Sequence, residues 1–161
     1  MNKVYLQLGS NIRNRYKYLS NGRRSINNEI GNIICQSKIY ESNPWGITDQ
    51  DQFLNQIIII DTNLSAKEIL EKSQEIERRS GRATKGKWEA RTLDIDILFF
   101  NNEIINTDHL KIPHPLIQER LFVLIPLSEI NKDLRHPILK KDIATLLSEC
   151  SDKGKVNEFT I

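Results

Sequence analysis

The chain has few of the residues that mark specialised folds. It contains two cysteines, five prolines and seven glycines among 161 residues, so neither a disulfide framework nor a collagen-like chain is expected. Its longest unbroken apolar run is five residues, at 121–125, whereas a transmembrane helix needs about 20. The N-terminal residues lack the apolar segment of a secretory signal, and no Cys/His cluster has the spacing of a zinc site. We therefore expect a single domain over residues 1–161, in the cytoplasm and without membrane attachment.

A complete glycine-rich phosphate loop is also missing. The stretch from Gly81 to Lys87 is followed by Trp88, where the P-loop requires Ser or Thr, and no Gly-x-Gly-x-x-Gly motif occurs. Any nucleotide must therefore be bound by side chains and metal ions.

The small net charge of +2 conceals a strong asymmetry. Residues 1–28 contain six basic residues and no acidic one, and residues 78–91 contain six basic residues and one acidic residue, Glu89. The rest of the chain is acidic. Local basic clusters on an acidic background favour a compact anionic ligand over a long polyanion, although an isolated charge run is more often a solvated loop.

The apolar pattern predicts an α+β fold. Period-two or β-branched apolar segments predict strands at 4–8, 33–40, 53–61 and 93–100, with a loop over 41–52. Helical spacing predicts a helix at 16–30 and a second that begins at the Ser65–Glu68 capping box and ends at Gly81. Asn101-Asn102 permits a hairpin into 103–105, and short helices are expected near 116–120, 122–130 and 142–149. The order βαββαβ indicates a ferredoxin-like antiparallel sheet with a helical C-terminal extension, in three α/β/α layers.

Asp94 and Asp96 are the strongest candidates for chemistry. Residues i and i+2 of a strand point to the same face, and we expect Leu98 and Phe100 to continue that face. Two neighbouring carboxylates repel each other unless cations are present, and Mg²⁺ is bound by one or two carboxylates together with substrate phosphates. The alternative is that the pair merely caps the end of the strand. The basic segment that precedes it favours metal-assisted phosphoryl transfer.

Two further segments are candidates for binding. Pro113 and Pro115 restrict the backbone around His114, which suits a donor to a phosphate oxygen, or equally a loop histidine with local hydrogen bonds. Phe53 and Asn55 share one strand face, where a ring can stack on a planar heterocycle and an amide can bind its edge. An aromatic residue in a strand is more often part of the core.

With these residues in view, the chain resembles the 6-hydroxymethyl-7,8-dihydropterin pyrophosphokinases of folate biosynthesis. The resemblance rests on motifs spread along nearly the whole sequence. They are Gly9-Ser10-Asn11, Asn43-Pro44-Trp45-Gly46, Phe53-Leu54-Asn55, Gln74 to Glu77 before Gly81-Arg82, Trp88, Arg91-Thr92-Leu93-Asp94-Ile95-Asp96-Ile97, Pro113-His114-Pro115 and Arg120-Leu121-Phe122.

The resemblance implies that a monomer transfers pyrophosphate from ATP to the hydroxymethyl group of the pterin and releases AMP. It assigns two Mg²⁺ ions to Asp94 and Asp96, and catalytic roles to Arg82 and Arg91. The residues it places around ATP are Gln74, Glu77, Lys87, Trp88, Arg91, Ile97, Lys111, His114 and Arg120. Those it places around the pterin are Ser42, Pro44, Trp45, Phe53, Asn55 and Phe122. Residues 82–90 are expected to close over the substrates.

Two other functions are compatible with parts of this pattern. A ferredoxin-like RNA-binding module would share the predicted core, but it should carry exposed aromatic residues on its sheet rather than a carboxylate pair. A metal-dependent nucleotidyl or glycosyl transferase would also use an Asp-x-Asp motif. We expect no nucleic-acid partner.

Overall fold

The computed structural model describes residues 1–45, 49–81 and 92–161. The strands of its larger sheet are β1 (Asn2–Ser10), β2 (Asn32–Gln36), β3 (Tyr40–Ser42), β4 (Phe53–Thr62), β5 (Asp94–Phe100) and β8 (Val156–Glu158). The helices are α1 (Arg15–Glu29), α2 (Ala66–Arg79), α3 (Leu121–Asn131) and α4 (Ile143–Glu149), with a single 3₁₀ turn η1 (Ile117–Glu119). The strands β6 (Ile105–Asn106) and β7 (Lys111–Ile112) form a separate hairpin.

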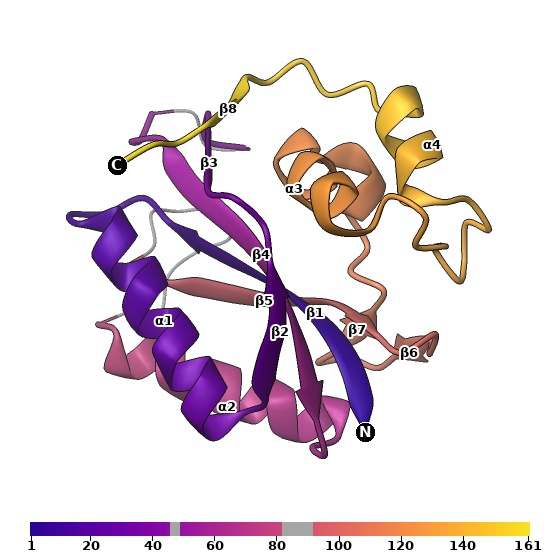
Figure 1. Ribbon diagram of the computed structural model, residues 1–161, viewed down its shortest axis with the longest axis horizontal. Helices are drawn as coiled ribbons and strands as arrows, with labels where there is room; N and C mark the ends of the chain where they lie inside the picture. Colours follow the sequence, from indigo (N-terminus) through magenta and orange to yellow (C-terminus); the bar gives the residue numbers. More distant parts are fainter. Residues whose placement is uncertain (46–48, 82–91) are drawn as a thin grey trace.

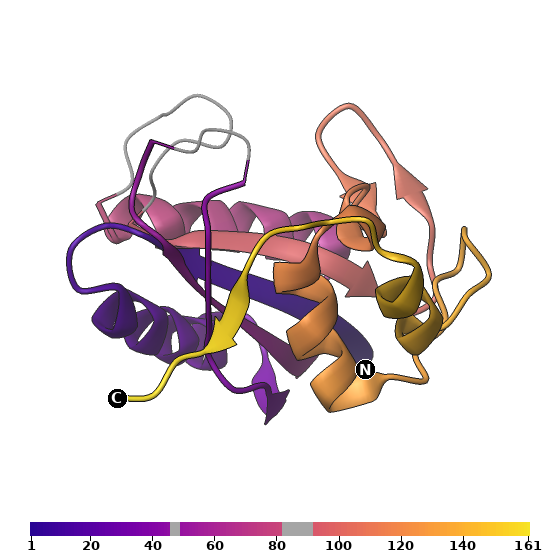
Figure 2. The same cartoon turned by 90° about the horizontal axis from the view of Figure 1, so that it is seen from above.

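The sheet has the topology that the sequence predicts. Its strand order is β5-β1-β4-β3-β8, and β2 pairs with β4 beside β3. All of its pairs are antiparallel. The βαββαβ core and the helical C-terminal extension are therefore confirmed. The chain after α4 passes α3 and ends as β8 beside β3 (Figure 2).

Helices cover both faces of the sheet, so it has two hydrophobic cores (Figure 1). On the α1/α2 side, Leu6, Leu8 and Ile95 pack with Leu19 and Ile69. On the α3/α4 side the core is a different set of residues: Tyr5, Ile57, Ile59, Leu98, Phe99, Val123, Leu124, Leu127, Ile143 and Leu146. Because apolar side chains alternate between the two cores, both faces of β1 and β4 are buried. Among the described residues, no helix is long and apolar enough to cross a membrane.

Helix α2 forms for the local reasons visible in its sequence. The Ser65 hydroxyl accepts from the backbone N–H of Glu68, and the Glu68 carboxylate accepts from that of Ser65. Arg78 lies in the last turn, where a cation complements the helix dipole. The helix stops at Gly81, which has a φ of +89° and donates its N–H to the Arg78 carbonyl. The helix predicted from the capping box is therefore confirmed.

The predicted strand over 33–40 is instead two strands. The Ser37 hydroxyl accepts the backbone N–H of Ile57, which interrupts the ladder between β2 and β4. Pairing resumes when Tyr40 meets Asn55, so residues 41 and 42 belong to β3 and not to a loop.

The predicted hairpin after β5 is wrong, although its turn forms. Asn101 has a φ of 49°, and the Glu103 N–H donates to the Phe100 carbonyl. Asn101 also exchanges two hydrogen bonds with Lys3 of β1. The following segment leaves the sheet, and β6 pairs with β7.

A β-bulge in β5 changes which face of the sheet its last side chains occupy, so the expectation from simple alternation is only partly met. The register with β1 shifts between Tyr5 and Leu6, so that Leu98 is the extra residue. Leu98 and Phe99 therefore both pack on the α3/α4 side, and Phe100 packs on the other side. Leu98 shares the aspartates' face as predicted, but Phe100 does not. The bulge leaves the Leu98 carbonyl to accept the backbone N–H of His114.

A buried histidine should make the stability of the fold depend on pH. His136 is 3% exposed, and its Nδ1 accepts the N–H groups of Ile138 and Leu139. Burial lowers the pKa of His136, so the unfolded chain takes up a proton at that site more readily than the folded one. The free energy of unfolding should therefore decrease as pH falls below about 6.5.

The variant His136→Asn isolates this effect, because Asn keeps an acceptor near the position of Nδ1 and does not titrate. We expect His136→Asn to have a lower free energy of unfolding than the wild type in denaturant titrations. The difference between the two proteins should be smaller near pH 5 than near pH 7.5. The exposed His109→Asn serves as the control and should show no such trend. A deficit for His136→Asn that is constant with pH would contradict the assignment.

Candidate functional site

The candidate site lies on the α3 side of the sheet, where β1 ends and β4 and β5 begin. Gly9 of β1 is paired with Asn55 of β4 on one side and with Asp94 of β5 on the other. Two residues earlier in β1, Gln7 is paired with Asp96 of β5. The register therefore places an amide and two carboxylates in one small area of the sheet.

The two aspartates share this face because the residue between them is anchored in the opposite core. The Ile95 side chain is buried on the α1/α2 side, and both aspartates are half-buried. Glu77 of α2, which is 6% exposed, accepts the backbone N–H of Ile95 at 2.8 Å. A helix carboxylate thus fixes the backbone between the two aspartates. The sequence indicated Glu77 only as an ATP-binding residue, and no local signal predicts this bond.

Arg120 is a cation that the described part of the structure places beside the aspartates. It is the N-cap residue of α3 and 7% exposed. Its guanidinium lies over the rings of Trp45 at 4.6 Å and Phe122 at 5.5 Å. Burial lowers the pKa of Arg120, and the negative charges of Asp96 and Asp94 act in the opposite direction. Its Nε is buried and has no hydrogen-bond partner within the described chain, which suits a group that binds an anion.

Asn55 is held rigidly beside the aspartates. It is 2% exposed, and its Nδ2 donates to the Ser42 hydroxyl at 2.7 Å. Its Oδ1 points toward Gly9, since a Cβ built on Gly9 would lie 3.5 Å from it. The ring of half-buried Phe53 lies on the same side, 3.7 Å from that built Cβ. Phe53 and Asn55 therefore share one face, as predicted, and half-buried Pro44 follows Ser42 by two residues.

His114 is anchored to the bulge of β5. Its backbone N–H donates to the Leu98 carbonyl at 3.0 Å, and its Nδ1 accepts the N–H of Leu116 at 3.2 Å. Because Nδ1 is an acceptor, the neutral ring carries its proton on Nε2. Lys111 lies in the β6–β7 hairpin, where its Nζ donates to the side chain of Asn106.

Two of the remaining predicted residues, Gln74 and Ile97, do not bring a side chain to this group. Gln74 is exposed on α2. The Ile97 side chain is buried in the core on the other face of the sheet, so only its backbone could meet a ligand here. Arg82, Lys87, Trp88 and Arg91 lie outside the described residues, as does the expected closure of 82–90.

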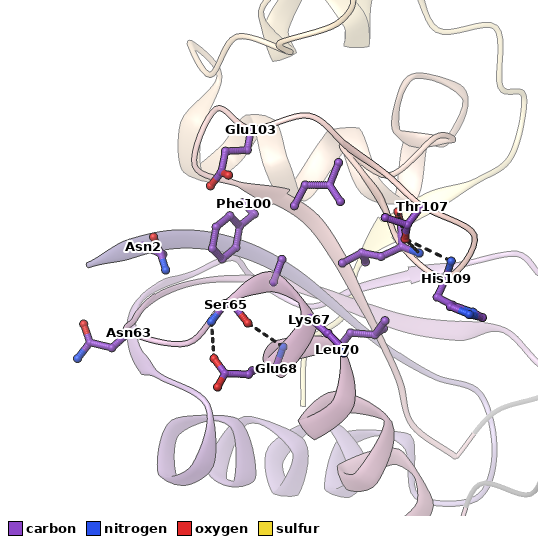
Figure 3. Close-up of a pocket in the computed structure, with 13 residues that line it drawn as sticks. Asn2, Asn63, Ser65, Lys67, Glu68, Leu70, Phe100, Glu103, Thr107 and His109 are labelled. Atoms are coloured by element: carbon purple, nitrogen blue, oxygen red, sulfur yellow. Dashed lines mark hydrogen bonds between the residues drawn. The ribbon is translucent and has the colours of Figure 1, made fainter.

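A cavity of about 630 Å³ lies elsewhere in the molecule, between the start of α2 and the β6–β7 hairpin (Figure 3). Its lining includes Ser65, Leu70 and Phe100, together with Asn2 and His109. Phe100 is at the opposite end of β5 from Asp94, and none of the predicted site residues lines the cavity.

The site offers a metal ion only part of its coordination shell. Within the described ranges, no group of three or more His, Cys, Asp or Glu residues could hold a metal. Two half-buried carboxylates on one face are a donor set that fits Mg²⁺ when a substrate supplies further oxygens.

Comparison with known proteins identifies sequence relatives that match most of the chain. The family model described as 7,8-dihydro-6-hydroxymethylpterin-pyrophosphokinase (HPPK) matches residues 5–132. The 2-amino-4-hydroxy-6-hydroxymethyldihydropteridine pyrophosphokinase of Bacillus subtilis (strain 168) is 45% identical over 130 residues, which cover 80% of this chain and 78% of the relative. The protein of the same name from Aquifex aeolicus (strain VF5) is 39% identical over 143 residues, 89% of each chain.

A solved structure shows the same fold at low identity. Wild-type Plasmodium falciparum HPPK-DHPS with pteroate matches with a TM-score of 0.75 and 18% identity, over 92% of this chain and 42% of that chain. This chain therefore spans less than half the length of the solved protein, and the likeness concerns the fold alone.

The bond between Glu77 and Ile95 can be tested without substrates. Glu77→Gln keeps an oxygen that accepts the Ile95 N–H, whereas Glu77→Ala leaves that buried donor unpaired. Glu77→Ala should therefore unfold with a free energy about 1–3 kcal/mol lower than Glu77→Gln in denaturant titrations. Equal values for the two variants would show that the bond does not stabilise this part of β5.

Proposed function

We infer the function of this chain from its family: it belongs to the 7,8-dihydro-6-hydroxymethylpterin-pyrophosphokinase family. We propose that it transfers pyrophosphate from ATP to the hydroxymethyl group of 6-hydroxymethyl-7,8-dihydropterin, a step of tetrahydrofolate biosynthesis, and releases AMP. The pterin hydroxyl oxygen bonds to the β-phosphorus of ATP as the bond from that phosphorus to the oxygen of the α-phosphate breaks. The hydroxyl proton leaves to solvent. The observation that carries the proposal is the shared face of Asp94, Asp96 and Asn55.

Asp94 and Asp96 are proposed to hold two Mg²⁺ ions together with the phosphates of ATP. When bound, these ions neutralise the negative charge that builds up on the transferred group. Glu77 contributes by fixing the backbone between the two carboxylates. Arg120 places a further positive charge beside them from the start of α3.

The same sheet face is proposed to bind the pterin. Phe53 and Phe122 would stack on the two sides of its ring, with Pro44 and Trp45 near its edge. Asn55 presents Oδ1 on this face while its Nδ2 is held by Ser42. An amide fixed in this way needs no reordering to bind the edge of a heterocycle.

Further residues are proposed to bind ATP on the strength of the family resemblance. They are Gln74, Lys87, Trp88, Arg91, Lys111 and His114, with the backbone of Ile97, and Arg82 and Arg91 are proposed to act in catalysis. For His114, the anchored backbone and the Nε2 proton support a role as donor to a phosphate oxygen.

The working unit proposed is a single-domain monomer in the cytoplasm. Both cysteines are free thiols, which fits a reducing compartment. None of the comparisons supports the RNA-binding alternative, and the family match argues against a nucleotidyl or glycosyl transferase.

Identification of the products tests the proposed function directly. The purified chain, incubated with ATP, Mg²⁺ and 6-hydroxymethyl-7,8-dihydropterin, should yield AMP and a pterin diphosphate in equal amounts by ³¹P NMR. Formation of ADP, or ATP consumption that does not depend on the pterin, would contradict pyrophosphate transfer.

The metal assignment predicts a large kinetic effect. Asp94→Ala and Asp96→Ala should each lower kcat by several orders of magnitude, because phosphoryl transfer loses most of its charge stabilisation without bound metal. Exposed Glu119→Ala removes a nearby carboxylate outside the sheet face and should remain close to the wild type. Turnover within about tenfold of the wild type in either aspartate variant would contradict the assignment.

The pterin assignment predicts a selective loss of affinity. Asn55→Ala should weaken pterin binding by about 1–3 kcal/mol, because a buried hydrogen-bonding partner is lost, while binding of an ATP analogue stays nearly unchanged in calorimetry. Ser42→Ala keeps the amide but removes its anchor, so a smaller loss is expected. If ATP binding weakens as much as pterin binding, Asn55 has only a structural role.

A further inference from the structure

Gly9 occupies the centre of the candidate site. It is paired with Asn55 of β4 and with Asp94 of β5, and it belongs to the strand between them. Neighbouring strands lie about 4.8 Å apart. The backbones of Asn55 and Asp94 are therefore about 10 Å apart. Gly9, which lies between them, carries no side chain.

A glycine inside a central strand needs a reason, because it stabilises a strand less than alanine does. Crowding explains the glycine at Gly31, between α1 and β2, where a built Cβ would lie 2.5 Å from the Asp61 carbonyl oxygen, and the fit is tight at Gly22 of α1, where it would lie 3.0 Å from Leu93. A left-handed backbone is the reason at Gly81.

Neither reason applies to Gly9 within the described part of the chain. Its φ lies outside the left-handed region. The three atoms nearest to a built Cβ are Asn55 Oδ1 at 3.5 Å, Phe53 Cδ1 at 3.7 Å and the Leu54 carbonyl oxygen at 3.8 Å. All three are ordinary van der Waals distances, so a methyl group fits at Gly9. A glycine where a methyl would fit is typical of a position that a ligand approaches closely.

We propose that Gly9 determines substrate specificity by leaving the sheet surface flat between the amide and the two aspartates. The pterin lies across β1 there, with its ring edge at Asn55 and its hydroxymethyl arm directed toward the phosphates at Asp94 and Asp96. This inference rests on the proposed function. A methyl at Gly9 would stand beside Asn55 Oδ1 and the Phe53 ring, in the space that a planar bicyclic ring needs.

The variant Gly9→Ala tests the proposal by steady-state kinetics and thermal unfolding. We expect kcat/KM for the pterin to fall about 10- to 200-fold, with the KM for ATP unchanged and the melting temperature equal to or above that of the wild type. Tyr5→Phe is the control on the same strand, since it removes the hydrogen bond to Asn131 far from the site. It should melt at a lower temperature but keep the wild-type KM for the pterin.

The possible outcomes separate this proposal from the function on which it rests. A wild-type chain that forms no pterin diphosphate would overturn both. A wild-type chain that is active, together with a Gly9→Ala variant of unchanged KM and kcat/KM for the pterin, would overturn only the role of Gly9. A Gly9→Ala variant that fails to fold or melts well below the wild type would also overturn it, because the methyl group would then clash within the free protein.

Discussion

The hydrogen-bonded position of β1 between β4 and β5 is the constraint on which the site depends. One edge of β1 is hydrogen-bonded to β4 and the other to β5. The register of these two pairings fixes Asn55 and Asp94 relative to one another through Gly9. A slip of one residue in either ladder would turn one group to the opposite face. The apolar residues of β1 that face the two cores oppose such a slip, because it would expose them or bury polar groups.

On this framework, electrostatics sets what the site can bind. Two half-buried carboxylates lie beside a buried guanidinium whose Nε has no partner in the described chain. We propose that a metal–triphosphate complex suits both groups, because it brings cations to the two carboxylates and anionic oxygens to Arg120. On this proposal, a nucleotide bound together with its metal ions fits the site better than either one separately.

Local features of the sequence were sufficient to predict some of this arrangement. The capping box defined α2, and period-two spacing placed Asp94 and Asp96 on one face. The bulge at Leu98 was not predictable in this way, because it depends on the register with β1. Strand β8 is a short polar segment whose pairing with β3 is non-local, and the stacking of Arg120 on Trp45 arises only when α3 packs against the sheet. Assignments at Arg82, Lys87, Trp88 and Arg91 remain predictions from the sequence.

If the two aspartates hold the metal ions together with the nucleotide, the number of bound metal ions depends on both carboxylates and can be counted. Mn²⁺ can replace Mg²⁺ and be followed by electron paramagnetic resonance in the complex with a non-hydrolysable ATP analogue and the pterin. We expect two protein-dependent Mn²⁺ ions in the wild-type complex and the loss of both in the double variant Asp94→Asn/Asp96→Asn. The same number of bound ions in both proteins would contradict it.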